Sequence, residues 1–399
     1  MITLTEAFEL IEKEVSRLPS RLVSITEAVG CELREEIISP INVPPFANSA
    51  MDGYAIRFDD LKGSGPWHLS VQDVIAAGDM ADAVLSSGNA AKIMTGAPMP
   101  KEADTVIRVE DIEAGNGDIT IKNKPRKGDH VRPAGDDIKK GITLYKSGEK
   151  LNPVGIGVLA SIGKATAKIT PRPGVAVLST GSELVNPGED ISGGQIYNSN
   201  DFIIKSLLKK DGLESPQGLT TSIDNVRDLY AALEGVLSEN DLVIASGGVS
   251  MGDFDLIPEA LKKLDGEILF HKVIVKPGKP VLFARVKGRW LLGLPGNPVS
   301  VFVGYHLYAK RIIAKLSGFD YSPRIGNGVL EENLPIKGDR HHYVGAWIRE
   351  SKNGFIVKSA ARQQSGRLYS IAGIDGFISV EGGTRVIEKG TEVDIEWLD

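Results

Sequence analysis

The feature that most constrains the fold is a unit repeated between residues 174 and 317, in which an apolar run ends in a loop rich in glycine or proline. The runs Val175–Ser179, Asp241–Ala245 and Leu291–Leu294 each end in such a loop, and a helical pattern follows. Alternating strands and helices are typical of a largely parallel sheet, whose ligands bind at the carboxyl ends of the strands. We therefore predict an α/β domain with a site at these loops.

Helix caps and residue spacing predict the remaining elements of this domain. A helix capped by Asn200 should end at Lys210, before Gly212, and Asp224 is placed to cap a second helix over 226–237. The other expected elements are a helix over 256–264, strands over 268–275 and 281–286, and a long helix over 298–316.

The regions on either side of this domain have different patterns of apolar residues. A chain of 399 residues is also too long for one core, so we expect two to four domains. Residues 1–39 favour a helix, with an apolar stripe that ends at Pro19. From 40 to about 148 the chain forms short β-rich runs, among them Trp67–Val74, Asp104–Val109 and Ile119–Ile121. The C-terminal residues also return to short β runs (354–357, 376–380 and 392–397), which predict a small barrel or sandwich.

A loose dinucleotide-binding motif at 155–160 is better interpreted as a short packed helix. Asn152 is a suitable N-cap, Pro153 occupies the first helical position, and Gly163 ends the run. The true motif follows a strand within a βαβ unit. The sequence contains no Walker loop, which disfavours a P-loop ATPase.

Composition excludes several classes of protein. A formal net charge of -6 argues against a general nucleic-acid binder, so any anion site must be a local cluster of Lys and Arg. The single cysteine, Cys31, rules out an intrachain disulfide framework and a cysteine-based zinc site, and it fits a reducing cytoplasm. No apolar run approaches the roughly 20 residues of a membrane helix. We expect a cytoplasmic protein with neither nucleic-acid nor membrane partners.

The first candidate site is the loop Ser246–Asp255, directly after the second apolar run. Its glycines would let backbone N–H groups approach an anion, and Asp253 and Asp255 could hold a hard cation such as Mg²⁺ through carboxylate oxygens. A tight strand–helix turn with a capping aspartate explains the same residues equally well.

The second candidate is a lysine cluster at Lys272, Lys276 and Lys279. On one strand Lys272 and Lys276 would point to the same face, and the Pro277-Gly278 turn would bring Lys279 near them. Three ammonium groups suit a tetrahedral oxoanion or a phosphate. The alternative is a solvated edge strand that carries lysines against aggregation.

The remaining polar residues carry weaker signals. Asn297 and Pro298 begin a helix in which Ser300 would face an anion at the N-terminus, although capping alone explains them. Taken singly, the acidic residues are most simply turn or cap residues: Asp52, Asp136, Asp137, Glu183 and Asp224. The histidines show no metal-ligand spacing on one helix face and are expected to be structural or exposed: His68, His130, His271, His306, His341 and His342.

Taken together, these motifs resemble the MoeA family of molybdopterin molybdenumtransferases, which is related to the E domain of gephyrin. Eight matching strings occur in family order and span nearly the whole chain: 44–55, 94–100, 132–137, 179–183, 194–200, 246–250, 276–280 and 293–300.

The resemblance implies a multidomain α/β and β architecture with four regions. A helical and extended connector comprises 1–39 and 141–170, and a β-rich lobe, 40–140, is inserted into it. The central α/β molybdopterin-binding domain, 171–318, is similar to adenylyltransferases, and a small β-barrel domain follows at 319–399. Members of this family form homodimers whose active site lies between the α/β domain and the partner's β lobe.

The resemblance also implies the roles of individual residues. The reaction inserts molybdate into adenylylated molybdopterin and releases AMP with the help of Mg²⁺. The expected Mg²⁺ ligands are Glu183, Asp224 and Asp255, with Asp52 and Asp137 joining them in catalysis from across the dimer. Lys272 would neutralise phosphate charge, and molybdate would lie by Lys276, Lys279, Ser300, Arg340 and Ser365. The other expected substrate-binding residues are Thr95, Gly247, Gly248, Ser250, Pro280, Pro295, Asn297 and Pro298.

Two alternatives remain open at this point. The α/β domain alone would also suit a molybdopterin adenylyltransferase, although the loop 246–250 lacks the Thr-Gly expected there and the β regions would be unexplained. A gephyrin-like scaffold without catalytic activity is the other alternative. For the transferase, the implied partners are an adenylyltransferase upstream and apo-molybdoenzymes or a carrier downstream. Molybdate and tungstate are too similar in size and charge to be distinguished from the sequence.

Overall fold

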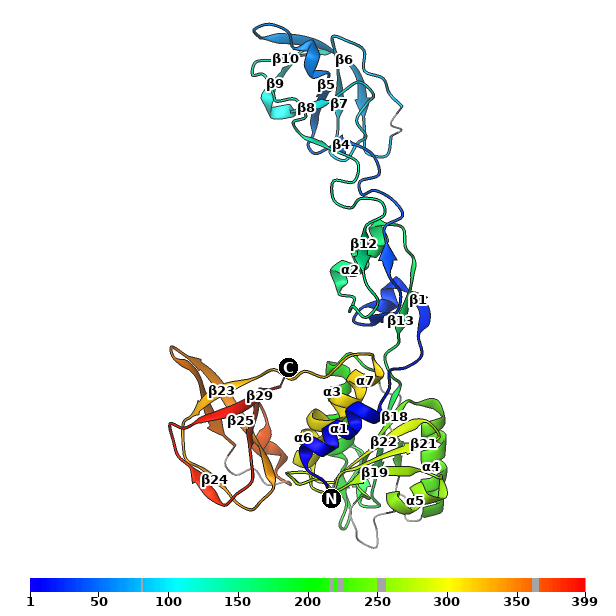
Figure 1. The fold of residues 1–399 in the computed structure, drawn as a ribbon, viewed down its shortest axis with the longest axis vertical. Helices are drawn as coiled ribbons and strands as arrows, with labels where there is room; N and C mark the ends of the chain where they lie inside the picture. Colours follow the sequence, from blue (N-terminus) through cyan, green and yellow to red (C-terminus); the bar gives the residue numbers. More distant parts are fainter. Residues whose placement is uncertain (80–81, 215–218, 222–225, 250–255, 361–365, 399) are drawn as a thin grey trace. The chain divides into compact units, whose positions relative to one another are not determined.

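The computed structural model describes residues 1–399 except 80–81, 215–218, 222–225, 250–255, 361–365 and 399 (Figure 1). The chain divides into two compact units, one made of Met1–Ser20 and Thr170–Asp399 and the other of Arg21–Ile169. Among the described helices, none combines the length and the apolar character that crossing a membrane requires.

The first unit contains the expected α/β domain, built on a six-stranded sheet in the order β17-β14-β18-β22-β21-β19. The first four strands run parallel, and β21 and β19 are antiparallel additions at one edge. In chain order the strands are β14 (Val175–Thr180), β17 (Leu219–Thr221), β18 (Leu242–Ser246), β19 (Glu267–His271), β21 (Leu282–Val286) and β22 (Arg289–Leu294).

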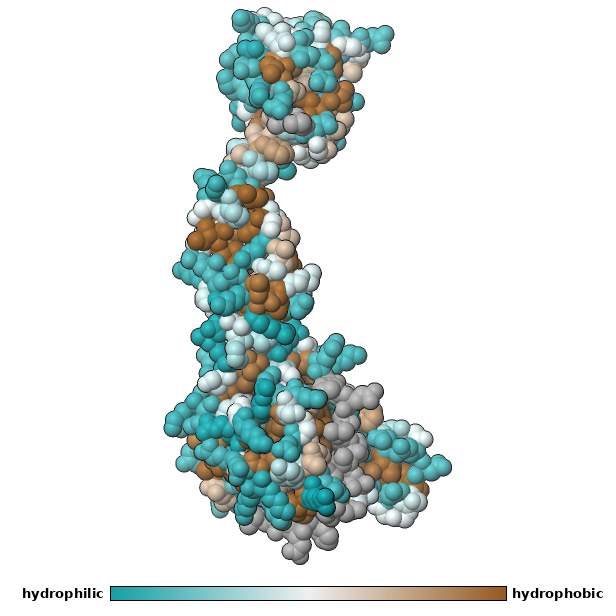
Figure 2. Space-filling view, turned by 90° about the vertical axis from the view of Figure 1, so that its right-hand side faces the viewer, coloured by the Kyte–Doolittle hydropathy of each residue, from teal (hydrophilic) through white to brown (hydrophobic). Residues whose placement is uncertain are grey.

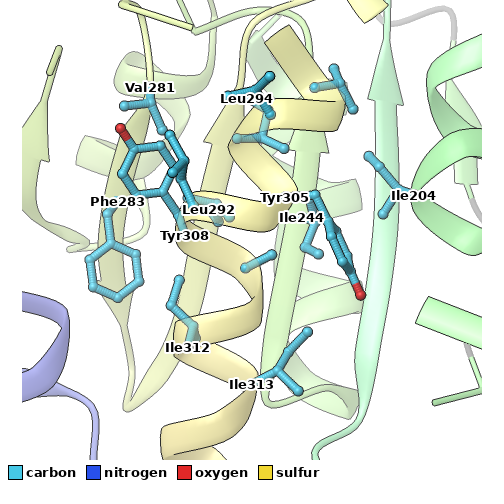
Figure 3. Packing of buried hydrophobic residues seen from close by; sticks show 14 of the residues in the cluster. Ile204, Ile244, Val281, Phe283, Leu292, Leu294, Tyr305, Tyr308, Ile312 and Ile313 are labelled. Atoms are coloured by element: carbon cyan, nitrogen blue, oxygen red, sulfur yellow. The ribbon is translucent and has the colours of Figure 1, made fainter. Parts of the chain in front are cut away.

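Side chains of this sheet alternate between two buried cores because successive residues of a strand point to opposite faces. Val177 and Ile244 pack on one face, whereas Leu178 and Val243 pack on the other. The first face is covered by α1 (Leu4–Glu14), α3 (Ser199–Lys210), α6 (Pro298–Gly304) and α7 (Lys310–Leu316), and the second by α4 (Val226–Glu239) and α5 (Ile257–Lys263). Figure 3 shows the first core, where Tyr305 and Tyr308 lie between the helix and the strands. The predicted α/β domain is confirmed, and its helices cover both faces of the sheet.

Two local predictions in this domain are wrong. The N-cap of α3 is Asn198, whose side chain accepts a hydrogen bond from the backbone N–H of Asp201, and Asn200 lies inside the helix. The predicted strand 268–275 ends at His271, because Lys272 adopts a positive φ of 73° and interrupts the extended backbone. Residues Val275–Lys276 form a separate short strand, β20.

The long helix predicted over 298–316 is present, but it contains a π-helical segment, η4 (Tyr305–Ala309), between α6 and α7. Every residue of η4 is buried, so this segment lies entirely within the core of the domain. The phenol of Tyr305 donates a 2.7 Å hydrogen bond to Asp211. Burial is the main cause that raises the pKa of Tyr305 far above its ordinary value, so this group stays a donor throughout the physiological range.

Helix α1 begins with a capping box between Thr3 and Glu6. The hydroxyl of Thr3 accepts from the N–H of Glu6 at 3.2 Å, and the carboxylate of Glu6 accepts from the N–H of Thr3 at 2.7 Å. The apolar stripe of α1 is buried against the α/β core, which is why residues 1–20 group with that unit. The rest of the predicted connector, from Arg21 onward and including 141–169, lies in the other unit.

Replacing Thr3 with alanine should increase the opening equilibrium constant of α1 about fivefold at neutral pH, because a helix N-cap is lost. Hydrogen exchange of the amides in residues 4–14 measures this constant. The hydrogen bond from the Thr3 backbone is the main cause that lowers the pKa of Glu6. The box therefore stabilises the helix above the ordinary glutamate pKa, and this contribution fades as the pH falls through the lowered value. Exposed Thr5 in the same helix, changed to alanine, is the control and should have no such effect.

The C-terminal part of the first unit is a closed barrel, as expected from its short β runs. Strands β25, β26, β23, β29 and β27 pair in turn, and β27 pairs back to β25. Their bounds are β23 (Ile325–Leu330), β25 (His341–Ser351), β26 (Gly354–Ser359), β27 (Gly376–Val380) and β29 (Glu392–Trp397). A further antiparallel pair joins β24 (Leu334–Ile336) to β28 (Arg385–Ile387). Strand β20 pairs in parallel with β25, so the α/β domain contributes a strand to the barrel sheet.

The second unit contains the β-rich lobe and a smaller part. The lobe is a six-stranded sheet in the order β8-β5-β7-β6-β10-β9, with β5 (Gly53–Ile56), β6 (Trp67–Ile75), β7 (Asn89–Ile93), β8 (Thr105–Arg108), β9 (Ile112–Ala114) and β10 (Asp118–Ile121). The smaller part pairs β1 (Arg21–Ser24) with β13 (Thr166–Thr170) and β3 (Ile37–Ile38) with β12 (Thr143–Tyr145). It also holds α2 (Pro153–Ser161), capped by Asn152 as predicted.

Candidate functional site

A cleft of about 1060 Å³ opens at the carboxyl ends of the parallel strands. Three loops line it, namely those that follow β14, β18 and β22, together with the start of α3. Strand β17, the second parallel strand in the chain, lies beside β14 on one side, and β18, the third, lies on the other. The order in which successive parallel strands are added to the sheet therefore reverses between β14 and β18, and open α/β sheets bind their ligands at such a point.

The paired glycines after β18 are required by close packing against β14. Both have positive φ, and a Cβ on Gly247 would lie 2.7 Å from the backbone oxygen of Thr180. The N–H of Gly247 donates to the carbonyl of Leu294 at 3.0 Å, so this group is not free to bind an anion. Helix α5 begins only at Ile257, so it does not directly follow these glycines. The glycines line the cleft by bringing the backbones of β14, β18 and β22 together.

Polar groups from the other two loops complete the described wall of the cleft. Glu183 is exposed and lines the cleft, and its carboxylate folds over Gly181, where a Cβ would meet it at 2.6 Å. Asn200 is buried and donates from its amide to the carbonyl of Gly296 at 2.8 Å, while its Oδ1 has no hydrogen-bond partner. This side-chain bond ties α3 to the loop Pro295–Pro298.

A second cavity, of about 660 Å³, lies on the other side of Asn297, which lines both. Residues of the α/β domain and of the barrel contribute to it. Its charged lining residues are Lys276, Lys279, Lys337 and Arg340. No aspartate or glutamate occurs among its described lining residues. On a chain of net charge -6, this local excess of positive charge favours an anionic ligand.

The pairing of β20 with β25 positions the cations of this cavity. Lys276 lies opposite His342 in the register, and the guanidinium of Arg340 donates to the carbonyl of Val275 at 3.4 Å. The turn through Pro277 and Gly278 then brings Lys279 to the same cavity, as predicted. Ser300 is buried in the first turn of α6 and also lines the cavity.

The structure thus brings together most of the described residues predicted for substrate binding. Glu183, Gly247, Gly248 and Pro298 line the first cavity, whereas Pro280 and Pro295 line the second. Asn297 is the N-cap of α6, as predicted, although its side chain makes no capping hydrogen bond. Lys272 does not occur among the described lining residues of either cavity, because the strand that was to align it with Lys276 ends before it. Asp224, Ser250, Asp255 and Ser365 lie outside the described residues.

The second unit holds the other predicted site residues. Asp52 accepts two hydrogen bonds from Thr95, one from its N–H at 2.7 Å and one from its hydroxyl at 2.8 Å. The bond from the backbone N–H is the main cause that lowers the pKa of Asp52, so its carboxylate is ionised at neutral pH. Two motifs more than 40 residues apart therefore meet on the lobe. Asp137 is exposed and donates from its backbone N–H to the carbonyl of Val43 at 3.0 Å.

Several lining residues were not predicted from the sequence. Thr180 and Asn198 line the cleft, while Lys337 and His342 line the second cavity. Lys337 stands three residues before Arg340, so its spacing was an available signal. His342 gave no such signal, because its position depends on the pairing of β25 with β20.

Comparison with known proteins gives a consistent result over the whole chain. Family models match residues 2–163 as "MoeA N-terminal region (domain I and II)", 176–315 as "Probable molybdopterin binding domain" and 327–398 as "MoeA C-terminal region (domain IV)". The molybdopterin molybdenumtransferase of Haemophilus influenzae is 40% identical over 99% of this chain and 98% of its own length. That of Staphylococcus aureus strain COL is 33% identical over 99% and 95%. A crystal structure of the molybdopterin biosynthesis moea protein from Pyrococcus horikosii superposes with a TM-score of 0.81 at 30% identity, covering 100% of this chain and 99% of that one.

Proposed function

Because this chain belongs to the MoeA family, we propose that it is a molybdopterin molybdenumtransferase, which inserts molybdate into adenylylated molybdopterin and releases AMP. Relatives that carry this name are 33–40% identical over nearly the full length of the chain. The three family regions are present in the same chain, which a lone adenylyltransferase domain would not need. The chain is accordingly a transferase of molybdenum cofactor biosynthesis.

The single observation that carries this proposal is the second cavity. It has room for a small tetrahedral anion, it is lined by Lys276, Lys279, Lys337 and Arg340, and it lies directly across Asn297 from the larger cleft. Charged donors of this kind bind oxoanions through short, charge-assisted hydrogen bonds. A molybdate held there would lie beside a substrate whose pterin and nucleotide occupy the cleft at the switch point of the sheet.

In this proposal the residues of the chain bind the nucleotide, orient the attacking water and neutralise the charge of the molybdate. Lys276 and Arg340 would neutralise the molybdate dianion while Ser300 donates its hydroxyl, and the loop at Gly247 would hold the nucleotide close to the three parallel strands. Release of AMP requires that water attacks one phosphorus of the phosphoanhydride, whose bridging bond then breaks. Asp52, held ionised by Thr95, is suited to orient that water.

The described donors agree in type with a bound Mg²⁺, which prefers carboxylate oxygens. Glu183 presents an exposed carboxylate to the cleft, whereas its proposed co-ligands Asp224 and Asp255 lie outside the described residues. Among the described residues, no group of three or more His, Cys, Asp or Glu side chains could hold a metal ion. The proposed Mg²⁺ site therefore depends on Asp224 and Asp255. Mg²⁺ would supply charge neutralisation at the phosphoanhydride.

A homodimer is the assembly that the surface of the second unit favours. Large apolar side chains are exposed on its smaller part: Leu22 at 67%, Ile38 at 51%, Ile142 at 42% and Val154 at 75%. Figure 2 shows hydrophobic residues gathered over this part. Exposed apolar patches commonly mark association surfaces. In such a dimer, the partner would supply Asp52, Thr95 and Asp137 to the cleft, and a cytoplasmic adenylyltransferase would supply the substrate.

Reconstitution tests the function directly. The purified protein, adenylylated molybdopterin, Mg²⁺ and molybdate are combined, and AMP release and activation of an apo-molybdoenzyme are measured. We expect both to depend on molybdate. Formation of adenylylated product from molybdopterin and ATP, without molybdate, would instead assign an adenylyltransferase. Absence of both reactions would favour a scaffold.

Changing Asp52 to alanine should lower the rate of AMP release about 10²-fold, because the carboxylate that orients water is lost. Since the pKa of Asp52 is lowered, its contribution should persist from neutral pH down to this lowered value and disappear below it. The matched control is Asp59→Ala, which removes another exposed carboxylate of the same lobe. Equal rates for the two variants would exclude Asp52 from catalysis.

A further inference from the structure

The proposed oxoanion cavity contains one lining side chain that the function above does not use. His342 is only 4% exposed, and its Nε2 has no hydrogen-bond partner. Buried polar atoms are nearly always paired, so an unpaired one at a binding cavity is a candidate ligand contact.

The position of His342 on β25 places it at the cavity. His342 and Val344 share a face of the strand and both line the cavity, and the intervening Tyr343 lines it as well. Lys276, also at the cavity, is the register partner of His342 on β20. The neighbouring His341 lies on the opposite face, where its Nε2 is 2.8 Å from the hydroxyl of Ser379.

The hydrogen bonding of the imidazole ring determines whether Nε2 can donate or only accept a hydrogen bond. The imidazole bonds to the backbone of Lys337, in the sense that raises its pKa, which is donation to the carbonyl. Because Nε2 has no partner, we assign this bond to Nδ1, which then keeps its hydrogen. In the neutral ring Nε2 then carries only a lone pair. An oxoanion also only accepts, so the two cannot bond until Nε2 is protonated.

The charges around His342 favour the neutral ring while the cavity holds no anion. Burial is the main cause that lowers its pKa, and the nearby charges of Lys276, Arg340 and His341 add to it. Lys279 and Lys337 also line the cavity, and none of its described lining residues is acidic. A bound dianion would oppose this positive field and favour the charged ring.

We propose that His342 is an oxoanion-binding residue whose Nε2 takes up a proton from solvent when a tetrahedral dianion binds, and then donates a hydrogen bond to it. This inference rests on the proposed molybdate site. Binding of molybdate thereby becomes coupled to protonation of the His342 side chain.

The sign of the coupling follows from linkage. The pKa of His342 is lowered in the absence of the anion and raised in its presence, so binding takes up a proton and affinity rises as the pH falls. Between the two pKa values, the dissociation constant for molybdate should increase about tenfold for each unit of rising pH.

Calorimetric titration of the full chain with molybdate, in buffers of different ionisation enthalpy between about pH 6 and pH 8, measures the proton uptake. We expect uptake of up to about one proton by the unmodified chain. His342→Gln, which keeps an amide donor near the Nε2 position but does not titrate, should bind with no uptake. His341→Gln is the matched control and should behave as the unmodified chain does. Sulfate, a tetrahedral dianion that does not titrate in this range, should show the same coupling.

Nitrogen NMR of histidine-labelled unmodified protein gives an independent readout that needs no folded variant. The Nε2 resonance of one of the six histidines should change from the unprotonated to the protonated type when molybdate is added. Molybdate binding without proton uptake, or with an unprotonated Nε2, would overturn the role of His342 and leave the proposed function intact. Failure of the unmodified chain to bind molybdate would overturn both.

Discussion

Replacing Lys276 with methionine is expected to reduce molybdate-dependent AMP release by about 10²- to 10³-fold, the usual cost of removing a charged donor from a preorganised anion site. Methionine keeps much of the length of the side chain and removes its charge. Because β20 pairs through the backbone, the strand and the register with His342 should persist. Steady-state kinetics with varied molybdate will show whether the loss lies in the KM for molybdate.

Lys263→Met provides the control, since Lys263 is an exposed lysine of α5 paired with Glu259 at 3.8 Å. Its rate should match that of the unmodified protein. Retention of the KM for molybdate in Lys276→Met would remove the second cavity as the molybdate site, whatever the change in overall rate.

Gly247→Ala is expected to lower the free energy of unfolding of the α/β domain by about 2 kcal/mol, because alanine is strained at the φ of 88° that this position adopts. The added Cβ would also press on the backbone of Thr180 at 2.7 Å, so the loop must move. The displaced loop should weaken nucleotide binding in the cleft. Native-state hydrogen exchange of β18 and β22 measures the stability, and inhibition by AMP measures the binding.

Gly235→Ala offers a control with the opposite expectation. Gly235 lies in the exposed interior of α4, and nothing lies within 4 Å of an added Cβ. Alanine there should stabilise the helix by up to about 1 kcal/mol. If both variants changed stability in the same direction, the strain assigned to Gly247 would be incorrect.

Local patterns in the sequence were sufficient to predict three of the four parallel strands, because β14, β18 and β22 are buried apolar runs followed by loops with glycine. The short strand β17 carries no such pattern and was not predicted. The same patterns located the cleft, since the carboxyl ends of such strands meet at one edge. They also predicted the cap of α2 at Asn152 and the short strands of the lobe and the barrel. These features depend on residues that are close together in the chain.

The features that sequence reasoning missed depend on contacts between distant segments. The strand predicted over 268–275 ends at His271, where Lys272 turns and the backbone of Ile2 bonds to it, and no local signal reports such a partner. Gly247 looked like a free backbone donor, but the carbonyl of Leu294 occupies its N–H. His342 became a candidate only once β25 was placed beside β20.

The strand that crosses from the α/β domain into the barrel sheet limits how this protein can be divided. Val275 and Lys276 lie in the sequence of one domain and in the sheet of the other. Recombination that exchanged the barrel for an unrelated domain would remove Arg340 and His342 and would leave the backbone of β20 unpaired. In evolutionary terms the two domains form one heritable module, and a chain that loses either should lose the anion cavity with it.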